Sequence, residues 1–329
     1  MADHQQAKSL VRRANATLDA AEPGQVATAL APFIGDTYLW RGMHPFGELT
    51  SVADVASTFW DPLKTAMGPL QRRPDIFFAG LNELDDFTST WVVEMGHMMG
   101  TWDAPWLGIA PARKLSFLRY CEFHRVVGDR IVETAHYIDI LALLAQTNRS
   151  PVAQTTGASV LSPGPRTHDG LLYDAHPEPE GRTTVGLISA MVDDLVGQGV
   201  NSPRDHLARF WTPDMCWFGP GGIGASGFYD GYRRGHAGPF EEGLGFVRHN
   251  GHLARLGEGH YGGFFGYPSL TMTSKGYMGL PASDTPADMR IIDLYRRDGD
   301  KLAENWIFID LPHFFMMQGL DLLGTVQNG

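Results

Sequence analysis

Two similar segments of the chain combine carboxylates with aromatic side chains, and the first also contains a histidine, a set that can carry acid/base chemistry. The first reads GDRIVETAHYID over residues 128–139, and the second reads GDKLAENWIFID over residues 299–310. Each segment ends in an aspartate, Asp139 or Asp310. Carboxylates beside aromatic residues are costly to bury unless they are hydrogen-bonded or used. General acid/base catalysis is therefore the first chemistry to consider.

Both segments are expected to form a β-hairpin, because Gly-Asp and Asp-Gly are typical turn residues. A two-residue turn at residues 128–129 would pair Val127 with Arg130 and set His124 opposite Glu133. Since strand side chains alternate with period two, one face of each hairpin is predicted to be polar and aromatic. That face would carry Glu122, His124, Glu133, Tyr137 and Asp139 in the first hairpin, and Asp293, Tyr295, Glu304, Trp306, Phe308 and Asp310 in the second.

The other face of the second hairpin is mostly apolar, with Ile292, Leu294, Ile307 and Ile309. This face is expected to pack on helices. The polar and aromatic face is then expected to line a cavity.

The two hairpins belong to a longer internal duplication with an offset of 171 residues (299 − 128). A repeat of this kind determines the whole domain organisation. Four aligned pairs support it: Arg119 with Arg290 and Gly108 with Gly279 at that offset, Gly96-His97 with Gly259-His260 at an offset of 163, and Trp40 with Trp217 at an offset of 177.

The duplication predicts two domains, residues 1–146 and 177–329. The linker between them, residues 147–176, is rich in Ser, Thr, Gly and Pro and has no periodic apolar face, so it cannot fold alone. Each copy begins with a helical pattern, at residues 7–18 and 184–196, and ends with strands. Helices followed by a run of strands indicate an α+β fold and argue against a doubly wound parallel sheet.

The ends of both copies resemble the SnoaL-like polyketide cyclase family, within the nuclear-transport-factor-2-like superfamily. The motifs in copy one are PDIFFAG, WVVEMGHMMG, GIAP, FHRVVGDRIVETAHYID and ILALLAQ; those in copy two are GHYGGFFG, GLP, LYRRDGDKLAENWIFID and LPHFFMMQGLDLL. The resemblance implies two tandem cone-shaped α+β barrels. In each, a bent antiparallel sheet would wrap around N-terminal helices and enclose a pocket, and the copies would form a pseudo-dimer.

The resemblance also implies a reaction, intramolecular aldol ring closure without metal or cofactor. The general acid/base of the family stands at the end of this strand, which places the role on Asp139 and Asp310. A family histidine aligns with His124, where copy two has Tyr295. A positioned base that removes a proton next to a carbonyl accelerates the reaction ~10²–10⁴-fold. We therefore predict a cofactor-independent cyclase, isomerase or lyase acting on a small, largely apolar carbonyl compound.

Copy two is the better candidate for this site, because its acidic and aromatic set matches the family more closely. The predicted substrate-binding residues are Glu122, Asp293, Trp306, Trp217, Trp40, His97, His260 and Tyr137. The alternative is a non-catalytic ligand-binding or scaffold protein of the same fold.

Two other motifs are interpreted without a function. Residues 222–227 match GxGxxG but lack a surrounding βαβ unit, so we predict a turn that could shape a pocket mouth. His249 and His252 are three apart, which on a strand places them on opposite faces, and no metal site is predicted.

Composition limits the partners. The 329 residues carry 26 Lys and Arg against 37 Asp and Glu, a net charge of −11, so nucleic acid and anionic membranes are not expected to bind. The expected partner is a small-molecule substrate, and a homo-oligomer of the pseudo-dimer is left open. No apolar stretch reaches the ~18–20 residues of a spanning helix, and only two cysteines occur. A cytoplasmic protein is predicted.

Overall fold

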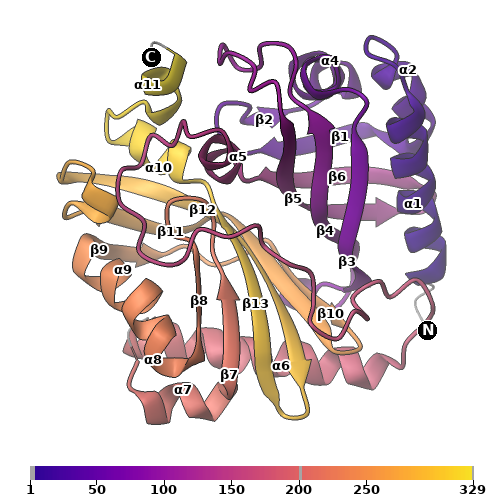
Figure 1. Cartoon of the computed structure of the whole chain (residues 1–329). Coiled ribbons are helices and arrows are strands. Elements are labelled where there is room, and N and C mark those ends of the chain that lie inside the picture. The colour runs from indigo at the N-terminus through magenta and orange to yellow at the C-terminus, as the bar shows by residue number, and fades with distance from the viewer. Residues whose placement is uncertain (1–3, 200–201, 328–329) are drawn as a thin grey trace.

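The computed structural model describes residues 4–199 and 202–327, which fold into two α+β halves (Figure 1). We call residues 4–146 half one and residues 177–327 half two. Each half contains helices and one bent sheet, so the predicted α+β class is confirmed. Within these residues neither sheet closes into a barrel, so the predicted barrels are open sheets instead.

Half one has a six-stranded sheet in the order β2-β1-β6-β5-β4-β3, antiparallel except for the parallel pair of β1 and β6. Its strands are β1 (Ile34–Gly42), β2 (Glu48–Leu49), β3 (Gln71–Leu81), β4 (Thr90–Thr101), β5 (Leu115–Val127) and β6 (Arg130–Ile138). Its helices are α1 (His4–Ala20), α2 (Val26–Leu30), η1 (Ala31–Phe33), α3 (Val52–Val55), the π-helix η2 (Ala56–Trp60), α4 (Asp61–Met67), η3 (Glu83–Asp85) and α5 (Ile140–Gln146).

Half two repeats this plan with the order β10-β11-β12-β13-β7-β8, and β9 also pairs with β11. Its strands are β7 (Trp211–Phe218), β8 (Ala225–Gly227), β9 (Leu244–His249), β10 (Ala254–Glu258), β11 (Tyr261–Ser274), β12 (Ser283–Asp298) and β13 (Lys301–Ile309). Its helices are α6 (Glu178–Gln198), α7 (Arg204–Phe210), α8 (Phe228–Tyr232), the π-helix η4 (Arg233–Ala237), α9 (Gly238–Gly243), η5 (Tyr277–Gly279), α10 (Leu311–Met317) and α11 (Leu322–Gln327).

The helices of each half cover the concave face of its sheet. Helix α1 illustrates why: Leu10, Val11, Ala14 and Leu18 recur at spacings of one to four residues and are buried. A stripe of this period places its apolar side chains on one face of a helix. The concave side of each sheet is therefore the helix-covered core.

The two sheets pack against each other through their other faces (Figure 1). Phe265 of half two lies between Trp91 and Phe123 of half one, with ring centroids 5.4 and 5.2 Å away. Ile292 and Leu294 belong to this layer, so the prediction that they pack on helices is wrong. The second half covers that face instead, and only Ile307 and Ile309 of the predicted set join the helix-side core.

A β-bulge shifts the predicted register of both hairpins. Val127 pairs with Arg130 as expected, but Val126 pairs with Ile131 and Arg125 with Glu133, which leaves Val132 as an extra residue. An extra residue reverses the side chains that follow it. The polar face was therefore predicted wrongly: Glu122 and His124 lie on the concave face, whereas Tyr137 and Asp139 lie toward the other half. Half two has the same bulge, so Trp306 and Phe308 also lie between the sheets.

The pairing also corrects one part of the internal alignment. Gly96 pairs with Tyr120, and Gly266 pairs with Ile291 in the equivalent strands. His97 therefore corresponds to Tyr267, and not to His260, which lies in the turn between β10 and β11. Matching the two Gly-His dipeptides was wrong because their similarity is local.

The linker, residues 147–176, lies across both halves (Figure 1). Ala158 forms a bridge with Ala225 of half two, and Leu171 forms one with Phe77 of half one. Leu172 is buried between the sheets. The segment therefore gains its order from contacts with both halves.

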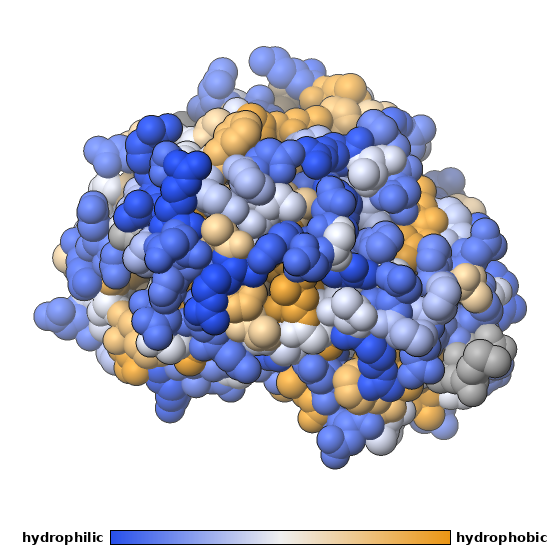
Figure 2. Space-filling model, turned by 90° about the horizontal axis from the view of Figure 1, so that it is seen from below, coloured by the Kyte–Doolittle hydropathy of each residue, from blue (hydrophilic) through white to orange (hydrophobic). Residues whose placement is uncertain are grey.

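Viewed from below, the molecular surface is mostly hydrophilic, with separate small apolar patches (Figure 2). In the described part of the chain, every helix is too short or too polar to cross a membrane.

Candidate active site

A network of buried polar side chains lies on the concave face of half one. Glu122 Oε1 lies 2.7 Å from His136 Nδ1, and Glu122 Oε2 accepts a hydrogen bond from Arg72 Nη1 at 3.0 Å. The same Arg72 nitrogen lies 3.0 Å from Glu94 Oε1, to which the Tyr120 hydroxyl donates at 2.6 Å. Strands β3, β4, β5 and β6 each contribute to this network.

Aromatic rings enclose His136. Trp40 stacks on it at a centroid distance of 5.8 Å, and Phe59 and Trp60 contact it at 4.6 and 5.3 Å. Phe59 and Trp60 come from the π-helix η2, a type of helix that is often found at functional sites. Trp40 thus lies at the concave site, next to the acidic network, and its role in binding a substrate stays a prediction.

Burial and charge fix the protonation states of this network. Burial lowers the pKa of His136, only partly offset by Glu122, so its imidazole is neutral at pH 7. Burial alone would raise the pKa of Glu122, but Arg72 and His136 hold it well below its ordinary value. Burial raises the pKa of Tyr120 well above its usual range, so this hydroxyl keeps its proton. The site therefore contains a neutral base, a fixed carboxylate and a proton donor.

Three buried nitrogens of this face lack a hydrogen-bond partner within the described residues: Arg72 Nη2, His124 Nε2 and His136 Nε2. His124 Nε2 lies 3.7 Å from Glu122 Oε2, while its Nδ1 lies 3.0 Å from the Thr134 hydroxyl. Buried polar atoms are nearly always paired with protein or water. These three atoms lie around Glu122, so unused hydrogen-bonding capacity is concentrated at this part of half one.

Half two has a different set at the equivalent positions. Asp293 stands where half one has Glu122, Tyr295 where it has His124, Asn305 where it has Thr134, and Ile307 where it has His136. Asn305 donates a hydrogen bond to Asp293. Burial raises the pKa of Asp293 to about 7, an effect that Asn305 and Tyr295 only partly offset. Half two therefore lacks the carboxylate–histidine pair.

Trp217 of half two also lies on the concave side, as predicted from its match to Trp40. It stacks on His236 of the π-helix η4 at a centroid distance of 3.7 Å. Burial lowers the pKa of His236 to about 3. This ring therefore stays neutral and acts as part of an aromatic core.

The predicted catalytic residues Asp139 and Asp310 are helix caps at the junction of the halves. Asp139 accepts a hydrogen bond from Ala142 N of its own helix and from Gly221 N of half two, both near 3 Å. Asp310 accepts one from His313 N and, reciprocally, one from His44 N of half one. These contacts are related by the duplication, so they mark an approximate two-fold axis.

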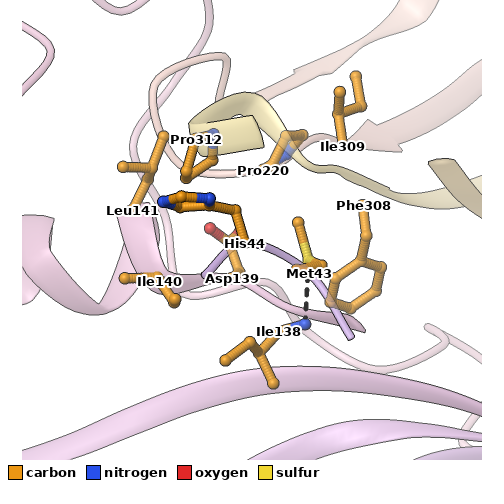
Figure 3. A pocket seen from close by; sticks show the side chains of 10 residues that line it. All are labelled: Met43, His44, Ile138, Asp139, Ile140, Leu141, Pro220, Phe308, Ile309 and Pro312. Atoms are coloured by element: carbon orange, nitrogen blue, oxygen red, sulfur yellow. Dashed lines mark hydrogen bonds between the residues drawn. The ribbon is translucent and has the colours of Figure 1, made fainter. Parts of the chain in front are cut away.

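The space at this axis is small (Figure 3). A cavity of about 10 Å³ lies there, lined by Met43, His44, Ile138, Asp139, Ile140, Leu141, Pro220, Phe308, Ile309 and Pro312. This volume is about the minimum that holds one water molecule. Burial raises the pKa of Asp139 and, to about 6, that of Asp310. Their geometry supports a role in capping and in joining the halves.

The remaining predicted residues lie apart from the concave site. The Tyr137 hydroxyl donates to Gly266 O of the other half at 3.0 Å, and Trp306 Nε1 donates to Pro163 O of the linker at 2.8 Å. His97 lies between the halves, 3.3 Å from Asp75. His260 is exposed at the β10–β11 turn, near Glu180. The register shift explains why Tyr137 and Trp306 were predicted on the wrong face. The misaligned Gly-His dipeptides explain why His97 and His260 were predicted at equivalent positions.

His136 and Arg72 were missed by sequence reasoning. The two-residue turn without a bulge placed His136 on the opposite face from Glu122. One signal was present: Ile131-Val132 and Leu302-Ala303 are adjacent apolar pairs that break the alternation at the same place in both copies. Such a break is typical of a bulge.

No group of three or more His, Cys, Asp or Glu side chains in the described ranges is arranged to hold a metal ion. His249 and His252 lie in edge contact at 5.5 Å, not on opposite faces, because the chain turns after β9. Their partners are not further metal-ligand types: His252 Nδ1 lies 3.0 Å from an Arg255 nitrogen. The expectation of a metal-free site stays a prediction.

No family model matches this chain, and no curated protein matches it significantly. Among solved structures it is similar to a protein from Jannaschia sp. CCS1, provisionally named a SnoaL-like polyketide cyclase, at 13% identity, over 43% of this chain and 90% of that chain, with a TM-score of 0.35. A provisionally named polyketide cyclase from Acidithiobacillus ferrooxidans is 17% identical, over 46% and 99% of the chains, with a TM-score of 0.35. An NTF2-like protein from Burkholderia thailandensis E264 is 18% identical, over 43% and 95%, with a TM-score of 0.32.

These neighbours are SnoaL-like and NTF2-like proteins, the resemblance that the sequence motifs indicate. Each match covers less than half of this chain and nine tenths or more of the other, so each neighbour is about the size of one half. The duplication itself is shown by the strand order that the two halves share.

Proposed function

We propose that the protein is a cofactor-independent acid/base enzyme of the cyclase, isomerase or lyase type, and that its reacting groups lie on the concave face of half one. The observation that carries the proposal is the Glu122–His136 pair. His136 Nδ1 is held by the carboxylate, while its Nε2 is buried and has no partner in the described structure. A carboxylate that orients an imidazole and stabilises its protonated form is a recurring catalytic arrangement.

The reaction begins with proton transfer from carbon. His136 Nε2 takes a proton from the carbon next to the substrate carbonyl, and the electron pair of the broken C–H bond moves to the carbonyl oxygen. Arg72 Nη2, the unpartnered nitrogen beside this network, donates to the enolate oxygen that forms. Glu122 balances the positive charge on His136 until the proton is returned. The residues of the chain thus complete an acid/base cycle.

The walls of this site support an apolar substrate. Trp40, Phe59 and Trp60 surround His136 and exclude water. A small, largely apolar carbonyl compound fits such walls, since its hydrocarbon part replaces ring contacts and its oxygen meets Arg72. Because Phe59 and Trp60 belong to η2, entry of the substrate requires this π-helix to move.

Proton transfer can be measured without knowing the final product. The wild-type protein is incubated in D₂O with a panel of small cyclic and open-chain ketones, and loss of the α-proton signals is followed by NMR. Substitution His136→Asn is expected to slow exchange by about 10²–10⁴-fold, and Glu122→Gln to slow it less. His236→Asn, which changes a buried histidine stacked on Trp217 in half two, is the matched control and should exchange at the wild-type rate.

Absence of exchange with every ketone of the panel, or an unchanged rate in His136→Asn, would contradict the proposal. Thermal melting of each variant separates loss of the base from loss of folding. The non-catalytic alternative is supported by the use of Asp139 and Asp310 as joints between the halves. Unchanged exchange in both half-one variants would favour it.

A further inference from the structure

A second cavity, larger than the one at the approximate two-fold axis, lies between the two halves and is separate from the concave site. It has a volume of about 220 Å³. At ~30 Å³ for each water-sized group, it has room for about seven such groups. Strands and helix α5 of half one, the loop after β7 of half two, and residues 155–162 of the linker form its walls.

Three polar side chains that line this cavity are more than nine tenths buried and carry an atom without a partner in the described part of the chain. These atoms are His97 Nε2, Arg119 Nε and Ser162 Oγ, on residues that are 7%, 3% and 8% exposed. A protein rarely leaves buried donors and acceptors unpaired. Three of them around one space indicate that a ligand supplies the missing hydrogen bonds.

The residues that line this cavity on one side of the pseudo-dimer differ from the residues at the equivalent positions on the other side. The duplication relates Ala142 and Ala145, which line the cavity, to His313 and Met316 of helix α10. It likewise relates Gly221 of the cavity wall to His44. Small residues therefore stand on one side where large ones fill the other.

The glycine-rich turn at residues 222–227 and the preceding Gly221 form part of the cavity wall. A Cβ on Gly221 would come within 2.2 Å of Ala142 N, and one on Gly224, whose φ is +82°, within 2.6 Å of Ala158 O. Glycines therefore allow helix α5 and the linker to approach this turn closely. The motif shapes the wall of the cavity and brings the linker over it.

Charges of both signs already stand around the cavity. Arg119 Nη1 lies 3.9 Å from Asp139, and its guanidinium also donates to Phe218 O and Ile307 O. His97 Nδ1 lies 3.3 Å from Asp75 Oδ2, and in the tautomer in which Nδ1 donates to this carboxylate, Nε2 is an acceptor. An anionic ligand would lie near Asp139 and Asp75, and a cationic ligand near Arg119, so a ligand of either charge meets a like charge. The ligand is therefore uncharged.

We propose that this cavity binds a small uncharged molecule that has an apolar body and one group able both to accept and to donate a hydrogen bond, such as a primary amide. Arg119 Nε donates to the acceptor, His97 Nε2 accepts from the donor, and the Ser162 hydroxyl serves either. Phe117 and Phe218 contact the apolar body. This site is independent of the proposed reaction in half one.

Three probes of nearly equal size test the proposal by isothermal titration of the full chain. Benzamide has the required group, benzoate replaces it with a charge, and toluene lacks it. Benzamide is expected to bind at least 10-fold more tightly than either of the others. Equal affinity for benzoate or toluene, or absence of benzamide binding, overturns the proposal.

Variants locate the binding. Ala145→Met introduces the residue of the opposite side and is expected to weaken benzamide binding at least 10-fold, whereas Ala190→Met, at an exposed position of α6, leaves it unchanged. Ser162→Ala should weaken binding about 2–10-fold, the effect of one hydrogen bond. His136→Asn should bind as the wild type does, which separates this site from the proposed reaction centre. Equal binding by Ala145→Met and wild type overturns the assignment to this cavity.

Discussion

At the scale of single residues, the equivalent carboxyl groups of the two halves, Glu122 and Asp293, have pKa values shifted in opposite directions. Glu122 of half one contacts Arg72 and His136, and its pKa is held low despite burial. Asp293 of half two has only the neutral Asn305 and Tyr295 as hydrogen-bond partners, so burial raises its pKa to about 7. One carboxyl is therefore permanently ionised, while the other changes charge near neutral pH.

This difference predicts opposite effects of pH on stability. The pKa of Asp293 is higher in the folded state than in the unfolded state, where it is near 4. The contribution of Asp293 to the free energy of unfolding is therefore fully present below pH 4 and is lost as the pH rises toward 7. Relative to Asp293→Asn, the wild type should lose up to roughly 4 kcal/mol of unfolding free energy over that range. Urea denaturation at several pH values measures it.

Glu122→Gln is the control of opposite sign. Because the folded-state pKa of Glu122 is lowered, its contribution is present above its unfolded pKa and lost as the pH falls. The difference between wild type and Glu122→Gln should therefore shrink toward acid. Parallel pH curves for wild type and Asp293→Asn would show that the Asp293 carboxyl is not perturbed.

At the scale of elements, the two π-helices and the two capped helices occur at matched places in both halves. Helix η2 presents Phe59 to Trp40 and Trp60 to His136, and η4 presents His236 to Trp217. Asp139 and Asp310 begin α5 and α10 at the ends of the equivalent strands. These elements position the concave face and the junction of the halves.

The capping aspartates should contribute more to stability than an ordinary cap. Asp310→Ala removes the acceptor of His313 N and of His44 N in the other half, and each buried donor left unpaired costs about 1–3 kcal/mol. We expect a loss of about 2–4 kcal/mol in urea denaturation. Ser51→Ala, at a more exposed cap that holds Asp54 N, should cost about 1 kcal/mol. Equal losses would show that the contact between halves adds nothing.

The sequence predicted these elements better than their faces. The helices at the start of each copy, the two-residue hairpin turns and the strand-end aspartates were all visible in residue types and periodicity. The strand register beyond the turns was not predicted. The bulge at Val132 depends on tertiary packing, and it adds one residue to the strand without changing its composition. That single residue hid His136 from the site and placed Tyr137 and Asp139 in it wrongly.

At the scale of the whole molecule, the apolar layer between the sheets joins the halves into one structure. Its residues come from both halves and include Trp91, Phe123 and Phe265. The duplication predicted two units and a pseudo-dimer, but the apolar strand face of half two was assigned to helices and not to the other half. An apolar strand face looks the same in sequence whether a helix or another sheet covers it.

This layer predicts a single cooperative unfolding transition. Phe265→Ala leaves a cavity between Trp91 and Phe123 and should cost about 3–5 kcal/mol. Phe246→Ala, at a phenylalanine that is 61% exposed on β9, should change stability by about 0.5 kcal/mol or less. Calorimetry that resolves two separate transitions would show instead that the halves unfold independently.

The linker that runs across both halves has a consequence for how such a molecule can evolve. In an assembly of identical subunits, every substitution appears twice and must suit both places. One continuous chain removes that constraint. A histidine can then occupy a position in one half while an isoleucine occupies the equivalent position in the other. Small side chains can likewise leave a cavity on one side of the junction while large ones fill the other side. The covalent link also keeps the two halves together at any protein concentration, so each half can change its function without dissociating from the other.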